Sequence, residues 1–427
     1  MHTGTLMPDQ PTVVSLADRF FDWRNRLLMS RRFQRAAASF PLTRRISSQS
    51  ASAVFDVVAG FVYSQVLLAC VQLKVFERLA DGAKSKQWLS KELDLSNDAV
   101  EVLLEAACAL KLLQKRTGDR YGLGMRGAPL VGNLPVLSMI EHHRTLYADL
   151  RDPVALLRRR SFDTAMASYW PYSPVAKAGE VASAMTRKSA SESANELASE
   201  VVSQSANEAS SETVNADQQR GLKDQPGLKE QVALYSSLMA ASQPFVADEV
   251  LEAVDFSQSK RVLDVGGGEG EFLSRLALHA PHLHVTLFDL PEVALRARAR
   301  FERANISARA QAVGGSFLAN QLPTDCDVVT LLRVIHDHDD TEARQILAAV
   351  RKAVPVGGRL ILAEPMAETP GAAAMGHAYF GFYLWAMGRG RSRSAQTITN
   401  MLKDAGFTSV SEIRTRIPMQ ARILVAR

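Results

Sequence analysis

The chain has 427 residues, 47% hydrophobic and 22% charged, which is a globular composition long enough for about two or three domains. Lysine and arginine number 50 against 45 acidic residues, and the N-terminal 50 residues account for the excess with eight arginines and three aspartates. We therefore expect no nucleic-acid groove across the body, and three cysteines without C-x-x-C spacing suggest a reducing cytoplasm. An unbroken run of about 18 apolar residues is absent, so no membrane-spanning helix is expected.

Residues 1–50 are predicted to be a basic arm. Aromatic and basic side chains alternate between residues 16 and 35. The apolar residues that share a face at helical spacing are Phe20, Trp23, Leu27 and Leu28. This pattern fits a helix packed on the body or on a second subunit. It also fits an interfacial helix, with aromatic rings at the acyl boundary of a membrane and arginines toward the headgroups. Both interpretations stay open.

Residues 51–131 are predicted to form a winged-helix domain. An apolar helix is expected over 54–79, a helix pair over 88–93 and 99–113, and a two-stranded wing over 115–123. Such modules often read DNA, but the candidate recognition helix is acidic and apolar and carries Glu101 and Glu105. We therefore predict a dimerisation domain and a homodimer, with no nucleic-acid partner.

The next two segments differ sharply in composition. Residues 132–177 are predicted to be a helical connector that contributes to a substrate pocket, with an aromatic cluster at 168–173. Serine, alanine and glutamate dominate residues 178–228, which cannot form a core and are predicted to be a disordered insertion.

From residue 229 the sequence predicts a second globular domain that ends at 427. Strands alternate with helices, and the expected strands are 261–265, 284–289, 309–313, 328–332, 359–363, 409–414 and 421–425. This alternation predicts an α/β, doubly wound, mostly parallel sheet with an antiparallel hairpin at one edge.

A glycine-rich turn follows the first of these strands. Asp264, Gly266 and Gly268 lie in it, but Glu271 occupies the position where a dinucleotide fingerprint requires its third glycine. An acidic loop repels a pyrophosphate and suits a cationic ligand with an amino-acid end and a nucleoside end. S-adenosylmethionine has these properties.

Asp289 ends the second strand, about 20 residues after the glycine turn. An acid at this place can accept hydrogen bonds from both ribose hydroxyls of a nucleoside. The alternative is a helix N-cap before Pro291. Together with the glycine turn, the position favours the ribose contact.

His336 follows the fourth strand and can act as a neutral general base. Glu364, at the end of the fifth strand, can hold its imidazole in one tautomer. A solvated loop and a metal site are alternatives, but adjacent loop residues rarely converge on one metal, so none is expected.

Five motifs together resemble the S-adenosylmethionine-dependent O-methyltransferases of the caffeate type, which carry an N-terminal winged-helix dimerisation domain. The motifs lie at 262–272, 288–293, 314–317, 334–337 and 404–407. The resemblance implies a class I methyltransferase sheet of seven strands, S-adenosylmethionine as cofactor and a homodimer.

The resemblance also implies roles for single residues. Gly266 would lie under the methionine end of the cofactor and Asp289 on the ribose. Ser316 and Phe317 would lie by the adenine, and Arg333 would stand near the cofactor where plant enzymes have lysine. The family has aspartate at Ser316, and a second acidic partner of the base would align with Ser392, so His336 is expected to have one carboxylate partner only.

Within the family, residues 150–157, 169–172 and 235–244 resemble bacterial enzymes that methylate carotenoids. This implies the tertiary 1-hydroxyl of an acyclic carotenoid as acceptor, and a cytoplasmic enzyme in peripheral contact with the photosynthetic membrane through residues 16–35. Two alternatives stay open within the fold: another apolar hydroxyl and a bacteriochlorophyll ring carbon. A third, from another class, is a winged-helix regulator that senses a ligand without turnover.

Overall fold

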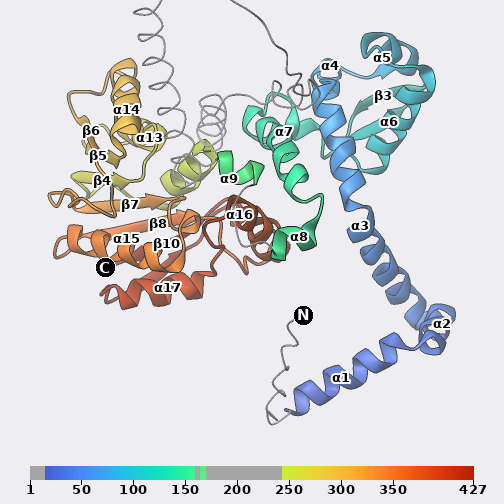
Figure 1. Ribbon diagram of the computed structural model, residues 1–427. Coiled ribbons are helices and arrows are strands. Elements are labelled where there is room, and N and C mark those ends of the chain that lie inside the picture. Colours follow the sequence, from blue (N-terminus) through green and yellow to red (C-terminus); the bar gives the residue numbers. More distant parts are fainter. Residues whose placement is uncertain (1–14, 159–163, 170–242) are drawn as a thin grey trace, which may run out of the picture. The chain divides into compact units, whose positions relative to one another are not determined.

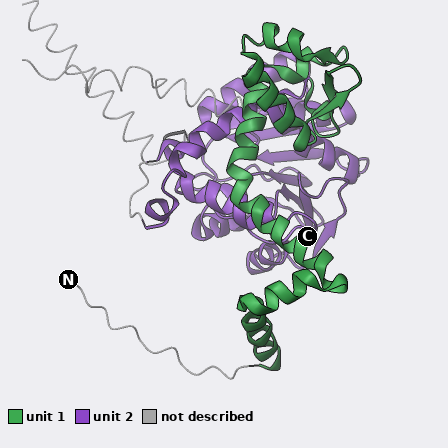
Figure 2. Cartoon of the chain, turned by 90° about the vertical axis from the view of Figure 1, so that its right-hand side faces the viewer, with its two compact units in different colours: residues 1–131 green, residues 132–427 purple. Residues whose placement is uncertain are grey.

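The computed structural model describes residues 15–158, 164–169 and 243–427. They belong to two compact units, residues 1–131 and 132–427, coloured green and purple in Figure 2. The predicted insertion at 178–228 and most of the aromatic cluster at 168–173 lie outside the described residues.

The first unit opens with three helices: α1 (Leu16–Met29), α2 (Arg31–Ser39) and α3 (Pro41–Gln72), drawn in blue in Figure 1. Ser15 caps α1 and forms a capping box with Asp18. Ser30 ends α1 and caps α2, so the single helix expected over 16–35 is two helices. Helix α3 begins at a proline and runs through the predicted domain boundary at residue 50.

Of the described helices, only α3 is long and apolar enough to cross a membrane by length and composition, with 17% of its most apolar window buried. The sequence analysis missed this because isolated polar residues interrupt its apolar runs. The core helix of a soluble protein passes the same test. Leu68, Cys70 and Val71 at the end of α3 are buried within the unit.

The winged-helix pattern is present in the rest of this unit. A left-handed residue, Lys74 (φ 54°), separates α3 from α4 (Val75–Arg78), so the apolar helix expected over 54–79 is interrupted. Two helices follow, α5 (Lys86–Glu92) and α6 (Asn97–Ala109). An antiparallel sheet of order β1-β3-β2 is formed by β1 (Lys84–Ser85), β2 (Leu113–Arg116) and β3 (Arg120–Leu123). Glu105 of α6 accepts hydrogen bonds from Lys115 of β2 and Tyr121 of β3, so this acid links the helix to the wing.

The second unit contains a seven-stranded sheet of order β6-β5-β4-β7-β8-β10-β9. Its strands are β4 (Arg261–Val265), β5 (His284–Asp289), β6 (Ala310–Gly314), β7 (Val328–Leu332), β8 (Arg359–Glu364), β9 (Val410–Ile413) and β10 (Arg422–Ala426). The antiparallel pairs of this sheet are β8 with β10 and β10 with β9, and its other pairs are parallel, which confirms the predicted mostly parallel sheet and its edge hairpin.

Helices cover both faces of this sheet (Figure 1). One core packs the helix at residues 243–253, α13 (Glu271–His279) and α14 (Pro291–Arg303) against the strands. The opposite core is formed with α15 (Asp340–Ala353) and α17 (Ala395–Asp404). The order of strands reverses between β4 and β7, where open α/β sheets bind their ligands.

A separate helical cluster belongs to the same unit. It is built from α7 (Leu134–Asp149), α8 (Pro153–Arg158), α9 (Ala165–Tyr169) and α16 (Gly381–Met387), the last of which continues the π-helix η3 (Met375–Phe380). The buried residues at its centre include Leu146, Leu156, Met166 and Tyr383.

Candidate active site

The turn after β4 needs glycine for two different reasons. Gly266 and Gly268 have positive φ angles of 71° and 59°, which residues other than glycine rarely adopt. A Cβ on Gly266 would come within 2.8 Å of Val334, and one on Gly267 within 2.4 Å of the Asp264 carboxylate. Around Gly268 no other atom of the described residues lies within 4 Å of such a Cβ, so this residue is the open side of the turn.

Asp264 is a buried carboxylate below this turn. Its Oδ1 accepts a hydrogen bond of 2.6 Å from Thr330 Oγ1. Its Oδ2 is buried and has no hydrogen-bond partner among the described residues. Burial, with a smaller effect of the Asp289 charge, raises the pKa of Asp264 to about 7. An unsatisfied acidic oxygen beneath an open glycine turn fits a cationic ligand such as S-adenosylmethionine.

Asp289 faces the same turn from the end of β5. Its Oδ2 accepts from the N–H of Gly268 at 2.8 Å, and its Oδ1 from the N–H of Leu290 at 2.7 Å. Leu290, not Asp289, is the N-cap of α14, and that cap has no side-chain hydrogen bond. The helix-cap alternative therefore does not describe this residue. Burial raises the pKa of Asp289 to about 6.

Ser316, Phe317 and Arg333 follow the ends of two other strands of the sheet. The loop after β6 is tied to β5 because the N–H of Gly315 donates to the carbonyl of Asp289 at 2.9 Å. The Phe317 ring stands edge-on to the ring of His338, with centroids 5.4 Å apart. Arg333 follows β7 in a left-handed conformation (φ 59°). Because these loops follow β6 and β7, the predicted cofactor residues gather at one edge of the sheet.

His336 lies on the short 3-10 helix η2 (Ile335–Asp337) and is buried. Its Nε2 is 3.1 Å from Oδ1 of Asp337, and its Nδ1 is 3.4 Å from Oε2 of Glu364. The backbone N–H of His336 donates to the same Glu364 oxygen at 3.2 Å. The expectation of a single carboxylate partner was wrong, because the next residue in the chain supplies a second one.

The two carboxylates change the protonation expected of His336. Burial alone would lower its pKa, but the charges of Asp337 and Glu364 outweigh it and raise the pKa to about 9. In the free enzyme near neutral pH the imidazole is therefore protonated on both nitrogens and positively charged, whereas the sequence analysis expected a neutral ring.

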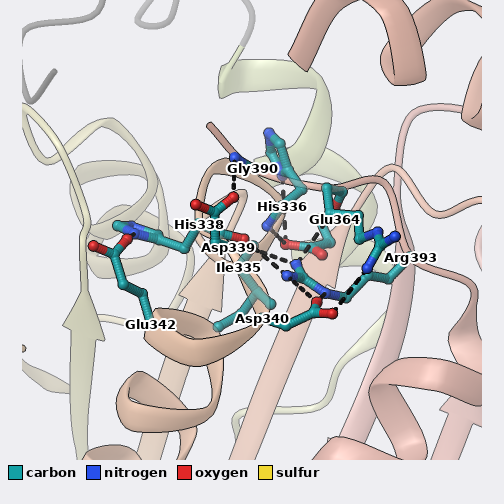
Figure 3. Close-up of polar contacts among 10 residues, drawn as sticks. Ile335, His336, His338, Asp339, Asp340, Glu342, Glu364, Gly390 and Arg393 are labelled. Atoms are coloured by element: carbon teal, nitrogen blue, oxygen red, sulfur yellow. Dashed lines mark hydrogen bonds and ion pairs between the residues drawn. The ribbon is translucent and has the colours of Figure 1, made fainter. Parts of the chain in front are cut away.

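A strap of residues 388–394 fixes the loop that carries His336. Arg393, 3% exposed, donates to the carbonyls of Ile335 at 2.9 Å and His338 at 2.8 Å, and to the carboxylate of Asp340 (Figure 3). The N–H of Arg391 donates to the carbonyl of His336 at 2.8 Å. These contacts to the loop backbone fix the position of His336, the proposed catalytic residue.

The strap also borders a cavity of about 400 Å³ in the second unit. Its other lining residues come from η3 and α16, including His377 and Trp385, and from Asp339 and Asp340 at the start of α15. Ser392, which aligns with the second acid of the family, lines this cavity and has a buried hydroxyl without a hydrogen-bond partner among the described residues.

Two histidine–tyrosine pairs lie near the site and were missed by the sequence analysis. His143 Nε2 is 2.7 Å from the Tyr379 hydroxyl, and His142 Nε2 is 3.0 Å from the Tyr383 hydroxyl. Phe380, next to Tyr379, contacts the ring of His336 with centroids 6.3 Å apart. Adjacent histidines on α7 and an aromatic run on η3 were visible signals, but their pairing spans more than 200 residues.

The strand order, the open glycine turn at its reversal point and the acid at the end of β5 together define a class I methyltransferase that uses S-adenosylmethionine as cofactor. Residues 218–408 match the family model of the O-methyltransferase domain, and residues 55–131 that of the O-methyltransferase dimerisation domain. The chain belongs to the S-adenosylmethionine-dependent O-methyltransferases, and the matched dimerisation domain supports a homodimer.

Two bacterial relatives match over most of their length. The demethylspheroidene O-methyltransferase of Rhodobacter capsulatus is 36% identical over 430 residues, covering 99% of this chain and 95% of the relative. The enzyme of the same name from Cereibacter sphaeroides is 36% identical, covering 90% of this chain and 89% of the relative.

Solved structures show the same fold. CalO1, a methyltransferase of calicheamicin biosynthesis with SAH bound, has a TM-score of 0.65 and 22% identity, covering 88% of this chain and 98% of its own. Human N-acetylserotonin methyltransferase in complex with SAM has a TM-score of 0.62 and 20% identity, covering 89% and 97%.

Proposed function

We propose that this enzyme transfers a methyl group from S-adenosylmethionine to the tertiary 1-hydroxyl of an acyclic hydroxycarotenoid of the demethylspheroidene or hydroxyneurosporene type. This would place it in spheroidene biosynthesis of a photosynthetic bacterium. The match to two demethylspheroidene enzymes, which extends over nearly the whole chain, supports this acceptor. The observation that carries the chemistry is the buried imidazole of His336 with a carboxylate at each nitrogen.

The geometry of the glycine turn supports the proposed cofactor residues. Gly268 would give the backbone access that the methionine end requires, and Gly266 would lie under that end because its lack of a side chain lets the turn approach Val334 closely. Asp264 would offer its unsatisfied oxygen to positive charge. Asp289 would accept hydrogen bonds from the ribose hydroxyls. In this proposal Ser316 and Phe317 border the adenine, and Arg333 lies near the cofactor at the end of β7.

The bound cofactor supplies a methyl group already activated by the positive charge of its sulfonium. A tertiary alcohol is a very weak acid, so its proton must leave as the new C–O bond forms, and His336 would accept it. Glu364 accepts the backbone N–H of His336 and lies 3.4 Å from Nδ1, which has no hydrogen-bond partner among the described residues, so its charge would stabilise the imidazolium. Phe380 packs beside this ring, and the site mainly orients the hydroxyl and excludes water.

A product-mass assay tests this function. The purified enzyme is incubated with labelled S-adenosylmethionine and a panel of hydroxylated acyclic carotenoids in detergent, with bacteriochlorophyll precursors and simple apolar alcohols as alternative acceptors. We expect one added methyl on the tertiary hydroxyl, and loss of most turnover with retained cofactor binding in His336→Ala. Methylation only of a ring carbon or of another alcohol would overturn the acceptor, and full turnover of His336→Ala would overturn the base.

The proposed acceptor also suggests where in the cell the enzyme acts. A carotenoid dissolves in the bilayer, so we propose a cytoplasmic homodimer in peripheral contact with the photosynthetic membrane. In this proposal residues 51–131 dimerise, 132–177 help to form the acceptor pocket, and 229–427 bind the cofactor.

A further inference from the structure

Helices α1 and α2 expose most of their apolar side chains, which the described part of the chain leaves uncovered. Neither helix contains a buried residue. Trp23 is 58% exposed and Phe20 56%, and Leu28, Met29 and Phe33 are also exposed. An apolar face of this kind in water requires a partner that covers it.

The charges are arranged around this face. At helical spacing Leu16, Phe20, Trp23 and Leu27 form one stripe of α1. Arg19 and Arg26 flank the stripe on one side and Arg24 on the other, whereas Asp18, Asp22 and Asn25 fall on the opposite face. Over residues 15–50 eight arginines oppose two aspartates, and all eight are exposed.

From this arrangement we infer that residues 15–46 form a docking arm for a bilayer that contains anionic lipids. The stripe would enter the acyl boundary, where tryptophan and phenylalanine are favoured, and the flanking arginines would reach the phosphates. A second copy fits less well, because it would bring arginine-rich surfaces together. The matched dimerisation model also begins only at residue 55, beyond the arm. The arm does not depend on which acceptor is methylated.

Vesicle binding tests the arm on the full-length protein. Cosedimentation is compared for phosphatidylcholine vesicles with and without phosphatidylglycerol. Each arginine near an anionic surface contributes about fivefold in affinity, so replacing Arg19, Arg24 and Arg26 by glutamine should weaken binding by about a hundredfold. The charge-matched control replaces Arg303, Lys352 and Lys403, which are exposed in the other unit, and should bind as the wild type does.

A second measurement locates the stripe. Lipids brominated on their acyl chains should quench the fluorescence of Trp23. The Trp23→Phe variant should lack this quenched part of the fluorescence. Trp23→Ser should bind vesicles more weakly than Asn25→Ala, which alters the opposite face of the same helix. Equal vesicle binding by the wild type and the triple arginine variant would overturn the inference. So would arm variants that dissociate the dimer in sedimentation and leave vesicle binding unchanged, since the partner would then be a second copy.

Discussion

The Nε2 atom of His336 lies 3.1 Å from Oδ1 of Asp337, the next residue in the chain. Glu364 stands 3.4 Å from the other ring nitrogen, and both carboxylates favour the charged ring. They outweigh burial and raise the pKa of His336 to about 9. The proposed base is therefore protonated in the resting enzyme at neutral pH, and it must lose that proton before it can accept one from an alcohol.

Replacing Asp337 by asparagine should lower the pKa of His336, because it removes the closer carboxylate. In the wild type kcat/KM should rise about tenfold per pH unit and level off near the pKa of about 9. In Asp337→Asn the plateau should begin about one unit lower. The pH–rate profiles of both enzymes measure this, with the exposed Asp404→Asn as control. Coincident profiles would show that Asp337 does not govern the base.

The same raised pKa makes stability depend on pH. The charged ring stabilises the fold fully below the unfolded pKa of about 6.5, and this contribution is lost as the pH rises through about 9. Urea unfolding of His336→Gln should therefore lose less stability over this window than the wild type does. An identical slope in both proteins would contradict the assignment.

Cofactor binding should release protons near neutral pH. Val334, two residues before His336, would meet a Cβ placed on Gly266, so the glycine turn lies close to the His336 loop and a positive ligand there opposes a second charge on the imidazole. It also favours ionisation of Asp264, whose pKa is about 7. Calorimetry in buffers of different ionisation enthalpy should show more proton release with S-adenosylmethionine than with its uncharged-sulfur product.

The His336→Gln variant distinguishes protons released by His336 from those released by Asp264, because only the release from Asp264 should remain. Equal proton release with the cofactor and the product would mean that the sulfonium charge changes the protonation of neither His336 nor Asp264.

Asp289→Asn should weaken binding of cofactor and product alike, since both contain the ribose. With a pKa of about 6, Asp289 changes from mostly protonated to mostly ionised between about pH 5 and pH 7. Wild-type affinity should therefore rise about tenfold over this range, and the variant should bind weakly at both ends. Titration calorimetry gives both constants. A variant with the wild-type pH dependence would remove Asp289 from the site.

Arg393→Lys should lower turnover while leaving cofactor affinity nearly unchanged. The planar guanidinium reaches two carbonyls of the loop and Asp340 at once, and a lysine cannot make this fork. The Ile335 carbonyl would still accept from the N–H of His338, but losing the other contacts of this guanidinium should cost about 1–3 kcal/mol in urea unfolding. Arg391→Lys is the matched control, because Arg391 binds the same Asp340 from an exposed position. Equal losses in the two variants would argue against a positioning role for Arg393.

Much of the sheet could be predicted because its central strands are buried on both faces. Residues 262–265 and 328–332 are buried without a break, which selects short apolar runs in the sequence, and the glycine turn marks where the first run ends. The breaks at Ser30 and Lys74 could not be predicted in the same way. Each depends on one residue whose cap or left-handed conformation interrupts an otherwise continuous helical pattern.

The details of the site depend on contacts that spacing does not encode. Asp337 meets the ring of its own neighbour only because both lie on the tight turn of η2. The pairing of His143 with Tyr379 joins residues 236 positions apart, on α7 and η3, and depends on how these helices pack in the folded domain.

Tyr379 and Tyr383, one helical turn apart, provide the last test. Tyr383 and its partner His142 are both buried, and burial lowers the pKa of His142 to about 4, so the pair is expected to be structural. Tyr383→Phe should lower the free energy of unfolding by about 1–3 kcal/mol, because it leaves a buried ring nitrogen with one fewer partner.

Tyr379 is half-buried and packs against Phe380, which contacts His336. Tyr379→Phe should therefore raise the KM for the acceptor with little loss of stability. Urea unfolding and steady-state kinetics on both variants separate the two roles. A reversed pattern, with Tyr379→Phe unstable and Tyr383→Phe impaired in KM, would mean that the pair of His142 and Tyr383, not that of His143 and Tyr379, lies beside the acceptor.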